Sequence, residues 1–419
     1  MAEKPLSTKK NMRLLLTISI ILLLDWYAFQ AVRTLAQTWP AAVRAMAYTF
    51  HWLVPIALAI WMIASASDAA DGIGKNTLTV VRTLFFIIYI SKILVVSILF
   101  IDDLRRVAMV AYNHFVGSGN YDEGRSRFVA QMSLFMGGIP FVSLIYGMIR
   151  NPYRYTIFKE TVRLKNLPKA LDGLRIVQIS DIHSGSFLFK EPVENAIRII
   201  NEQKADLAFF TGDLVNSMAK EVEPFIDIFS GIRAKYGVFS VLGNHDYGDY
   251  HRWDTPEDKE QNMENLKDAH RQMGWDLLLN ENRMVEINGE QVAVLGVENY
   301  SSHPRFPKYG DLKKAYNGAG QAPLKLLLSH DPSHWLDQVT SDYTDIDLTF
   351  SGHTHGMQFG VEIPGWIKWS PIKYVYKQWA GLYQEGQQYL YVNRGLGYLG
   401  YPGRVGILPE VTVIDLKRG

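Results

Sequence analysis

Four long apolar segments within the first 150 residues constrain the fold of this 419-residue chain more than any other feature. A helix that spans a bilayer needs ~20 predominantly apolar residues. The segments lie near Leu14–Val32, Ala45–Ala64, Thr83–Ile101 and Phe128–Met148. The first could pass for a signal peptide, but no small-residue cleavage site follows it and three more segments come after it. We predict an all-α four-helix transmembrane region over residues 1–150, then a linker over residues 151–170.

Lys and Arg are unevenly distributed around these segments, and cytoplasmic loops normally carry the excess. With the N-terminus inside, twelve of them are inside: Lys4, Lys9, Lys10, Arg13, Lys75, Arg82, Arg150, Arg154, Lys159, Arg163, Lys165 and Lys169. Six are then outside: Arg33, Arg44, Arg105, Arg106, Arg125 and Arg127. We therefore expect a multi-pass protein of the cell inner (plasma) membrane with a cytoplasmic C-terminal domain.

Two charged residues, Asp25 and Lys92, lie near the middle of apolar segments. Isolated charges are costly at that depth and normally pair or face the interior of a helix bundle. One interpretation is an ion pair that packs the first segment against the third. The other is a polar path or a site for a lipid head group.

The pattern changes after residue 170 to short runs rich in β-branched residues, as in buried strands. The runs are Leu174–Ser180, Asp206–Thr211, Val238–Leu242, Val292–Val297, Leu324–Ser329, Asp347–Ser351, Tyr389–Val392 and Val411–Asp415. Amphipathic helices are expected over Glu191–Glu202 and Thr255–Met273, and Asn288-Gly289 indicates a β-hairpin. Strands that alternate with helices predict a layered α/β domain over residues 171–419.

Polar clusters follow five of the predicted strands. They are Asp181-Ile182-His183, Gly212-Asp213, Gly243-Asn244-His245-Asp246, Ser329-His330-Asp331 and Gly352-His353-Thr354-His355. Ligands of α/β sheets bind beyond the carboxyl ends of the strands. We therefore expect these Asp, Asn and His side chains to meet at one edge of the sheets.

This set of side chains suits two divalent metal ions. The chain has no Cys, so a metal site must use His, Asp, Glu or Asn. Two ions ~3.5–4 Å apart can clamp the attacking and leaving oxygens of a phosphoryl group, and they acidify bound water so that hydroxide is available at neutral pH. The near-balance of 43 Lys+Arg against 42 Asp+Glu gives no sign of a nucleic-acid partner.

The ordered motifs D-x-H, G-D, G-N-H-D, H and G-H-x-H resemble those of the calcineurin-like metallophosphoesterase family over about Leu167–Leu416. The run Leu171–Val177, the run Asn393–Gly397 and Pro409-Glu410 are similar to its bacterial membrane-associated branch. The resemblance implies a four-layer α/β/β/α metallophosphoesterase sandwich. Related purple acid phosphatases have Tyr where this chain has Asn216, so Mn, Zn or ferrous iron are better candidates than a ferric centre.

The resemblance also implies roles for individual residues. Asp181, His183 and His355 would hold one metal ion. Asn244, His330 and His353 would hold the other, with Asp213 as the bridge. His245 would protonate the leaving oxygen or hold the phosphate, and Asp246 would orient His245.

Arginine is well suited to bidentate binding of phosphate. Arg394 is therefore a candidate substrate contact, and Arg404 is a weaker one. The stretch from Trp366 to Tyr401 is rich in Trp and Tyr, which usually indicates packing. Since the chain is anchored, we hypothesise that some of these rings lie at the lipid interface.

The leading functional hypothesis is a membrane-anchored phosphodiesterase or pyrophosphatase that attacks its substrate with a metal-bound hydroxide. The anchor suggests a lipid-linked substrate, and some proteins that the chain resembles cleave the pyrophosphate of UDP-diacylglucosamine. One alternative is a catalytically silent membrane scaffold or sensor that binds metal or phosphate. Another, weaker one is a transporter-like role for the spans. Metal-dependent hydrolysis of a generic phosphodiester distinguishes an enzyme from either.

Overall fold

The computed structural model describes residues 8–66, 73–116, 123–363 and 365–419. The chain divides into two compact units, Met1–Tyr146 and Gly147–Gly419. The boundary falls inside the fourth long helix, so the last turn of that helix belongs to the second unit. Lys4, one of the charges assigned to the inside, lies outside the described residues.

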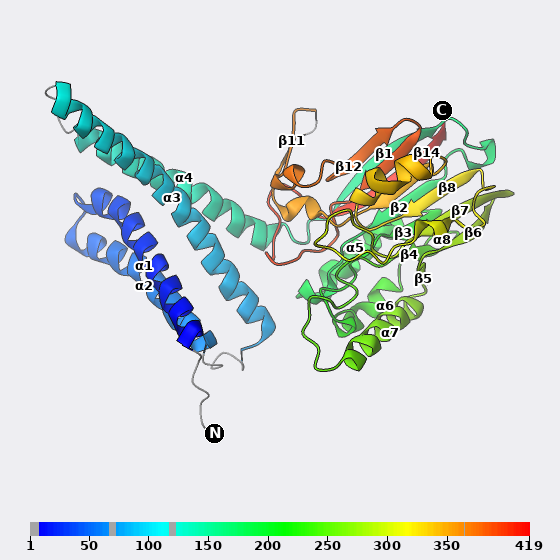
Figure 1. Ribbon diagram of the computed structural model, residues 1–419, viewed down its shortest axis with the longest axis horizontal. Coiled ribbons are helices and arrows are strands. Elements are labelled where there is room, and N and C mark those ends of the chain that lie inside the picture. Colours follow the sequence, from blue (N-terminus) through cyan, green and yellow to red (C-terminus); the bar gives the residue numbers. More distant parts are fainter. Residues whose placement is uncertain (1–7, 67–72, 117–122, 364) are drawn as a thin grey trace. The chain divides into compact units, whose positions relative to one another are not determined.

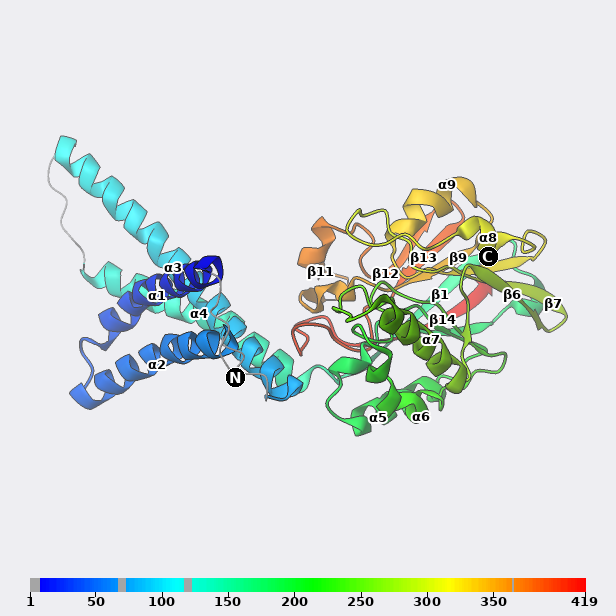
Figure 2. The same cartoon turned by 60° about the horizontal axis from the view of Figure 1, so that its bottom comes forward.

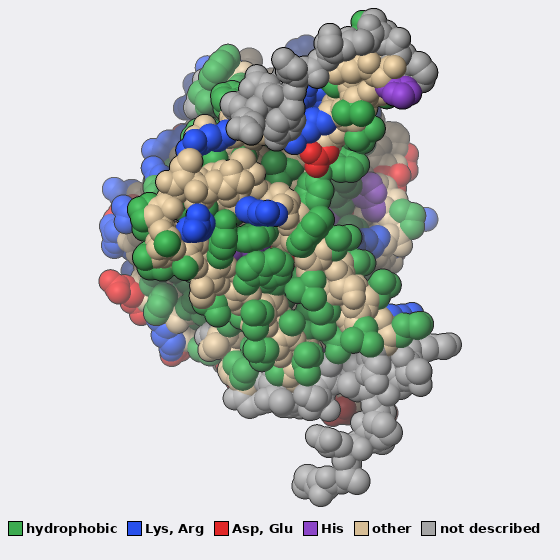
Figure 3. Space-filling view, turned by 90° about the vertical axis from the view of Figure 1, so that its left-hand side faces the viewer, with side chains coloured by type: hydrophobic (Ala, Val, Ile, Leu, Met, Phe, Trp, Pro, Cys, Tyr) green, Lys and Arg blue, Asp and Glu red, His purple; other side chains and the backbone are tan. Residues whose placement is uncertain are grey.

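Long apolar helices make up the described part of the first unit, at the places predicted for the spans (Figure 1). Their bounds are α1 Thr8–Ala36, α2 Ala41–Ala66, α3 Lys75–Val116 and α4 Glu123–Arg150. Each helix contains a stretch long and apolar enough to cross a membrane. Large side chains such as Leu23, Phe50 and Phe135 are exposed, and Figure 3 shows a broad hydrophobic area on one face. Such a surface suits contact with lipid rather than water.

Asp25 and Lys92 form an ion pair that joins α1 to α3. The Asp25 side chain is fully buried, and the Tyr89 hydroxyl donates a hydrogen bond to its second carboxylate oxygen at 2.7 Å. From α2, His51 Nε2 lies 3.0 Å from the Asp25 carbonyl oxygen. The predicted packing pair is therefore confirmed, and its neighbours connect three helices.

The second unit is built around two six-stranded mixed sheets. The first sheet has the order β1-β14-β2-β3-β4-β5. Its strands are β1 Thr156–Leu164, β2 Arg175–Ile179, β3 Leu207–Phe210, β4 Val238–Ser240, β5 Asp276–Leu277 and β14 Glu410–Arg418. The second sheet has the order β12-β13-β9-β8-β7-β6. Its strands are β6 Glu281–Ile287, β7 Glu290–Gly296, β8 Leu324–Leu328, β9 Leu348–Ser351, β12 Gly381–Glu385 and β13 Gln388–Val392.

Helices cover the outer faces of the two sheets (Figure 2). They are α5 Lys190–Glu202, α6 Ile226–Phe229 and α7 Pro256–Gln272 over the first sheet, and α8 Leu312–Tyr316 and α9 Thr340–Asp342 over the second. A buried core lies between the sheets, where the Phe209 and Phe350 ring centroids are 4.9 Å apart. A further core lies between the first sheet and its helices, and another lies between the second sheet and its helices. This is the expected α/β/β/α sandwich.

Local sequence signals explain the position of several elements. Thr255 caps α7 in a reciprocal capping box with Asp258, which satisfies backbone N–H groups that a helix start leaves unpaired. Asn288 and Gly289 both have positive φ, of 51° and 85°, as the tight turn between β6 and β7 requires. Each predicted strand is present, with ends that differ by a few residues.

The interpretation of residues 151–170 as a linker is wrong. This segment contains β1, which pairs in parallel with β14 along its whole length. The side chains of β1 alternate between exposed and more buried positions, since an edge strand has one face on the core. A charged, alternating edge strand is easily mistaken for a polar connection.

The Asp25–Lys92 pair leads to a stability prediction. Lys92→Met alone leaves a buried carboxylate without its cation, so we expect the thermal midpoint of the detergent-solubilised protein to fall by several degrees. The double variant Asp25→Leu/Lys92→Met removes both charges and should recover most of that loss, because replacing a whole buried pair costs less than breaking it. A double variant no more stable than Lys92→Met would contradict a simple ion pair.

Candidate metal centre

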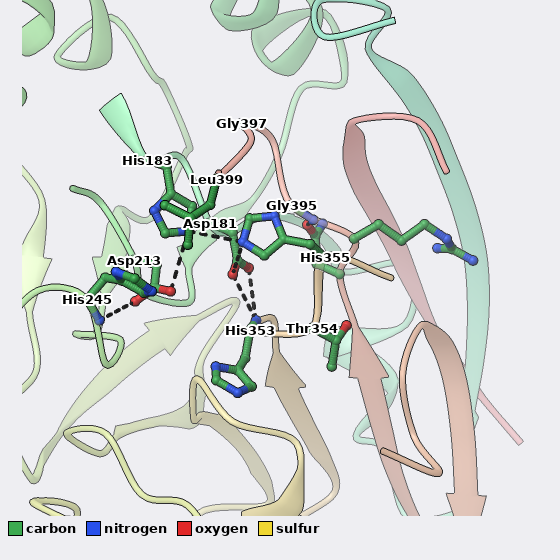
Figure 4. A network of polar contacts seen from close by, with 12 residues as sticks. Asp181, His183, Asp213, His245, His353, Thr354, His355, Gly395, Gly397 and Leu399 are labelled. Carbon is green, nitrogen blue, oxygen red and sulfur yellow. Dashed lines mark hydrogen bonds and ion pairs between the residues drawn. The ribbon is translucent and has the colours of Figure 1, made fainter. Parts of the chain in front are cut away.

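The predicted site residues follow the carboxyl ends of five strands. Those strands are β2, β3 and β4, which are parallel in the first sheet, and β8 and β9, which are parallel in the second. The two sheets face each other across the central core, so both contribute side chains to one site. Figure 4 shows some of these residues close together beyond the strand ends, among them Asp181, His183, Asp213 and His355.

The first group of potential ligands is Asp181, His183 and His355, whose ligand atoms lie within 4.8 Å of one another. His355 Nε2 is 3.1 Å from Asp181 Oδ1 and 3.0 Å from His183 Nε2. All three residues are buried. One carboxylate and two imidazoles at such distances can bind Mn, Zn or ferrous iron.

The second group is Asp213, His330 and His353, which meet the same 4.8 Å limit. His330 Nε2 lies 3.2 Å from Asp213 Oδ2. The Asn244 amide oxygen is 2.8 Å from His353 Nδ1, so the predicted amide ligand adjoins this group.

Asp213 connects the two groups. The carboxylate oxygen that faces His330 is also 3.5 Å from His183 Nε2 in the first group. The structure therefore brings all seven predicted ligands together, with Asp213 in the central position.

The backbone at these positions is conformationally unusual. Positive φ is uncommon in residues other than glycine. It occurs at five of the seven predicted ligands: Asp181 (50°), His183 (47°), Asp213 (60°), His353 (70°) and His355 (50°). Gly352 has no room for a Cβ atom, which would collide with the Ser180 hydroxyl and the Asp181 carboxylate. Such strain costs ~1–3 kcal/mol per residue and is typical of functional sites.

In both His330 and His353, one ring nitrogen is hydrogen-bonded to a neighbouring group outside the site. The other ring nitrogen faces the site and is available to a metal ion. A carbonyl oxygen can only accept, so the contact of His330 Nδ1 with Thr211 O at 2.7 Å places the hydrogen on Nδ1. In the neutral imidazole His330 Nε2 can therefore donate its lone pair to a metal ion, and this atom is buried without a hydrogen-bond partner among the described residues. His353 Nε2 contacts the Tyr376 hydroxyl at 2.9 Å, and that hydroxyl donates to Asp331. Similar outer contacts orient metal-binding histidines.

The electrostatics of the pocket favour a cation. Burial alone would lower the pKa of His330, but the neighbouring Asp213 carboxylate and, less strongly, Asp181 raise that pKa to about 10. The carboxylates thus hold a proton on a fully buried imidazole at neutral pH. A divalent ion among these groups would supply the positive charge instead, so the residues present fit a metal.

His245 lies beside the two groups and is only partly buried. Its ring centroid is 5.0 Å from that of His183. Its Nδ1 contacts the Asn216 carbonyl oxygen at 2.8 Å, which places a hydrogen on Nδ1 and leaves Nε2 for exchange with a ligand. The carbonyl of Asn216 is a functional contact that side-chain motifs could not reveal.

The predicted role of Asp246 is wrong. Its buried carboxylate accepts hydrogen bonds from the backbone N–H groups of Asp213, Leu214 and Val215 at 2.9–3.2 Å, and from Gly243 at 2.9 Å. The orienting partner of His245 is the Asn216 carbonyl oxygen instead. Asp246 therefore fixes the backbone that carries Asp213.

The predicted substrate contact of Arg394 is also wrong. Its side chain is 3% exposed, and its guanidinium pairs with Glu410 at 2.6 Å and with Glu362 at 2.5 Å. The Phe158 ring covers it at 4.2 Å from the centroid. A sequence pattern cannot show that two carboxylates already occupy this guanidinium.

Arg404 supports a loop rather than a substrate. It is fully buried and donates to the carbonyl oxygens of Arg394, Gly395 and Gly397. The same loop donates from Leu396 N to Ser180 O and from Gly397 N to Asp181 O, at 2.8 and 2.9 Å. Arg404 thereby stabilises the segment that is bonded to Asp181, the first predicted metal ligand.

Comparisons with known proteins agree with this arrangement. Residues 12–152 match the family described as "Probable Calcineurin-like phosphoesterase, transmembrane domain", and residues 174–357 match "Calcineurin-like phosphoesterase". The chain is 32% identical over 276 residues to the uncharacterized metallophosphoesterase YkuE of Bacillus subtilis (strain 168), which covers 65% of this chain and 90% of that protein.

Two other relatives carry similar descriptions. The uncharacterized metallophosphoesterase Cj0846 of Campylobacter jejuni is 29% identical over 297 residues, 70% of each chain. The "Transmembrane protein with metallophosphoesterase domain" of Danio rerio is 28% identical over 284 residues, 66% of this chain and 61% of that protein. The match to YkuE over nearly its full length, together with the two matched domains, shows that this chain belongs to the calcineurin-like metallophosphoesterase family.

Proposed function

We propose that the protein is a membrane-anchored, dinuclear-metal phosphoesterase that hydrolyses a phosphoester or pyrophosphate of a lipid-linked substrate. The central observation is the Asp213 carboxylate oxygen, which lies 3.2 Å from His330 Nε2 and 3.5 Å from His183 Nε2. A single oxygen shared by two histidine groups suits a ligand that bridges two cations.

The ligands divide between two positions. Asp181, His183 and His355 would hold one ion, and Asn244, His330 and His353 the other, with Asp213 shared. Bound divalent ions would stabilise negative charge on phosphoryl oxygens and make water available as a nucleophile near neutral pH.

The protein's own groups supply positioning and a proton. His245 Nδ1 is held by the Asn216 carbonyl oxygen, so His245 Nε2 is the atom that gives a proton to the leaving oxygen or donates to the phosphate. The Asp213 carboxylate accepts from the His245 backbone N–H at 2.9 Å, which couples the acid to the bridging ligand. Asp246 acts as a positioning residue.

The first activity prediction concerns the bridge and the acid. Asp213→Asn and His245→Ala should each lower metal-dependent hydrolysis of a soluble aryl phosphodiester by about 10²–10⁴-fold, the usual effect of losing an acid or a charge-stabilising group. His251→Ala is the matched control, because His251 is exposed and its ring contacts Trp253 outside the pocket. Parent activity that persists in both site variants would exclude the mechanism. Metal binding without hydrolysis of any phosphate substrate would instead favour a silent scaffold.

Metal removal should affect stability as well as activity. Chelation followed by dialysis leaves Asp181 and Asp213 buried without a cation, so the thermal midpoint should fall and then recover when Mn or Zn is added. A ligand at about 100 times its dissociation constant stabilises a folded protein by ~2.7 kcal/mol. His330→Ala should weaken the metal-dependent shift, whereas His251→Ala should keep it. An identical midpoint with and without chelator in the parent would argue against buried metal ions.

The membrane topology is a further part of the proposal, with the catalytic domain in the cytoplasm. Since the chain has no Cys, single introduced cysteines report sidedness cleanly. A membrane-impermeant maleimide added to intact cells or spheroplasts should label Gln37→Cys, between α1 and α2, but not Lys313→Cys on α8 before lysis. Labelling of Lys313→Cys without lysis would reverse the assigned orientation.

A further inference from the structure

The strands β10 Val361–Ile363 and β11 Ile367–Trp369 form a small antiparallel hairpin outside the two main sheets (Figure 1). Large apolar side chains are exposed on and beside it. We call this set the hairpin surface: Met357, Phe359, Val361, Ile363, Trp366, Ile367, Tyr374 and Val375. Trp366 and Tyr374 are 78% and 75% exposed. Apolar side chains gathered in this way mark an interaction site rather than ordinary protein surface.

The hairpin exposes its apolar face and turns its charged face toward the domain. A hairpin that packs on a domain in water normally does the reverse. Alternate residues of a strand point to opposite faces. Val361 and Ile363, with the cross-strand partner Ile367, share the exposed face. The intervening pair, Glu362 and Lys368, turns its charged groups toward the domain. The Glu362 carboxylate pairs with buried Arg394, and the Lys368 ammonium donates to the Ala380 carbonyl oxygen. The charged face is thus anchored to protein, and the apolar face is left outward.

The hairpin surface begins at the metal centre itself. Met357 is only two residues beyond His355, and Gly356, Met357 and Gln358 all have positive φ of 53–55°. Hydrogen bonds hold this turn in place, from the Ser370 hydroxyl to Gly356 O at 2.8 Å and from the Gln358 amide to Tyr401 O at 2.8 Å. The apolar hairpin surface therefore extends, through a turn held by hydrogen bonds, to the predicted metal ligand His355.

The base of the hairpin is also bonded to the end of a predicted span. Gly147, in the last turn of α4, accepts a hydrogen bond from Arg404 N at 3.1 Å. The adjacent Val405 donates to Gln358 O at 2.8 Å and accepts from Gly360 N at 2.9 Å. The end of α4 and the start of β10 are thus linked by three short backbone contacts. Because α4 is long and apolar enough to cross a membrane as far as Arg150, we expect this base to lie near the lipid head groups.

We propose that the hairpin surface inserts into the adjacent lipid leaflet and guides a phospholipid-type substrate from the bilayer to the metal centre. The inference rests on the proposed function. Trp and Tyr rings prefer the interface between lipid and water, and exposed aliphatic side chains gain free energy by leaving water. Lys373, beside Tyr374, suits the anionic head groups found there. The acyl chains can then stay in the leaflet while the phosphate group reaches the ligands next to Met357.

Several aromatic residues between Trp366 and Tyr401 do not take part. Tyr376, Trp379, Tyr391 and Tyr398 are buried in the domain. The sequence hypothesis of interfacial rings is therefore narrowed to Trp366 and Tyr374, together with aliphatic neighbours that composition did not single out.

A fluorescence experiment tests membrane contact with the full chain in nanodiscs of phosphatidylethanolamine and phosphatidylglycerol. An environment-sensitive fluorophore on Trp366→Cys, the only thiol in the chain, should emit at shorter wavelength and be quenched by nitroxide-labelled lipid. Met284→Cys is the matched control, because Met284 is a 44% exposed apolar residue on β6. Water-like emission at both positions, with no quenching by nitroxide-labelled lipid, would overturn the proposal. The same result is expected if the hairpin surface binds a protein instead of lipid.

A kinetic experiment tests the role in substrate access. The double variant Ile363→Ser/Trp366→Ser should lower kcat/KM for a long-chain phosphodiester in vesicles by about tenfold or more, the effect of losing ~1.4 kcal/mol or more of apolar contact. Hydrolysis of a soluble aryl phosphodiester should stay unchanged, as should both rates in Met284→Ser. Equal losses on both substrates, or no loss on either, would overturn the access role. Absence of aryl ester hydrolysis in the parent would instead count against the proposed function, while the fluorescence result still decides membrane contact.

Discussion

The candidate metal centre depends on the placement of one carboxylate, that of Asp213. Its Oδ2 faces His330 and His183, which come from different sheets, and its Oδ1 accepts from the His245 backbone. A buried carboxylate is tolerated only where cations or hydrogen-bond donors surround it. The sandwich supplies these donors by directing the ends of parallel strands from both sheets to one pocket. The site is thus assembled only when both sheets are packed together.

Asp246 explains how this carboxylate is kept in place. Four backbone N–H groups converge on its side chain, three of them from the residues that begin with Asp213. Those hydrogen bonds offset the cost of the left-handed conformation at Asp213. This preorganisation lets the Asp213 carboxylate keep its geometry before any metal ion binds. It matters because two cations beside Asp213 would repel each other.

Sequence reasoning located the strand ends and their side chains, because β-branched runs that stop at polar residues give a direct signal. It failed where the partner of a group is distant in the chain. Asp246 follows His245 but bonds to residues 213–215 and 243, and Arg394 meets Glu362 and Glu410 only in the folded domain. It also missed β1 and the hairpin. Both have short or charged alternating patterns, and their pairing is set by tertiary contacts rather than by propensity.

Arg394 shows how a residue without a role in chemistry can still fix the site. Its guanidinium joins Glu410 of the first sheet to Glu362 of the hairpin, and the residues after it donate hydrogen bonds to Ser180 O and Asp181 O. One loop therefore holds both Asp181, the first predicted metal ligand, and the charged face of the hairpin. Removing the Arg394 guanidinium would leave the fully buried Glu410 carboxylate without its cation. The hairpin surface and the metal centre are thus held at a fixed separation. A fixed separation suits a substrate whose phosphate group is held at one depth in the membrane. It does not suit a hairpin that moves as a lid over the substrate.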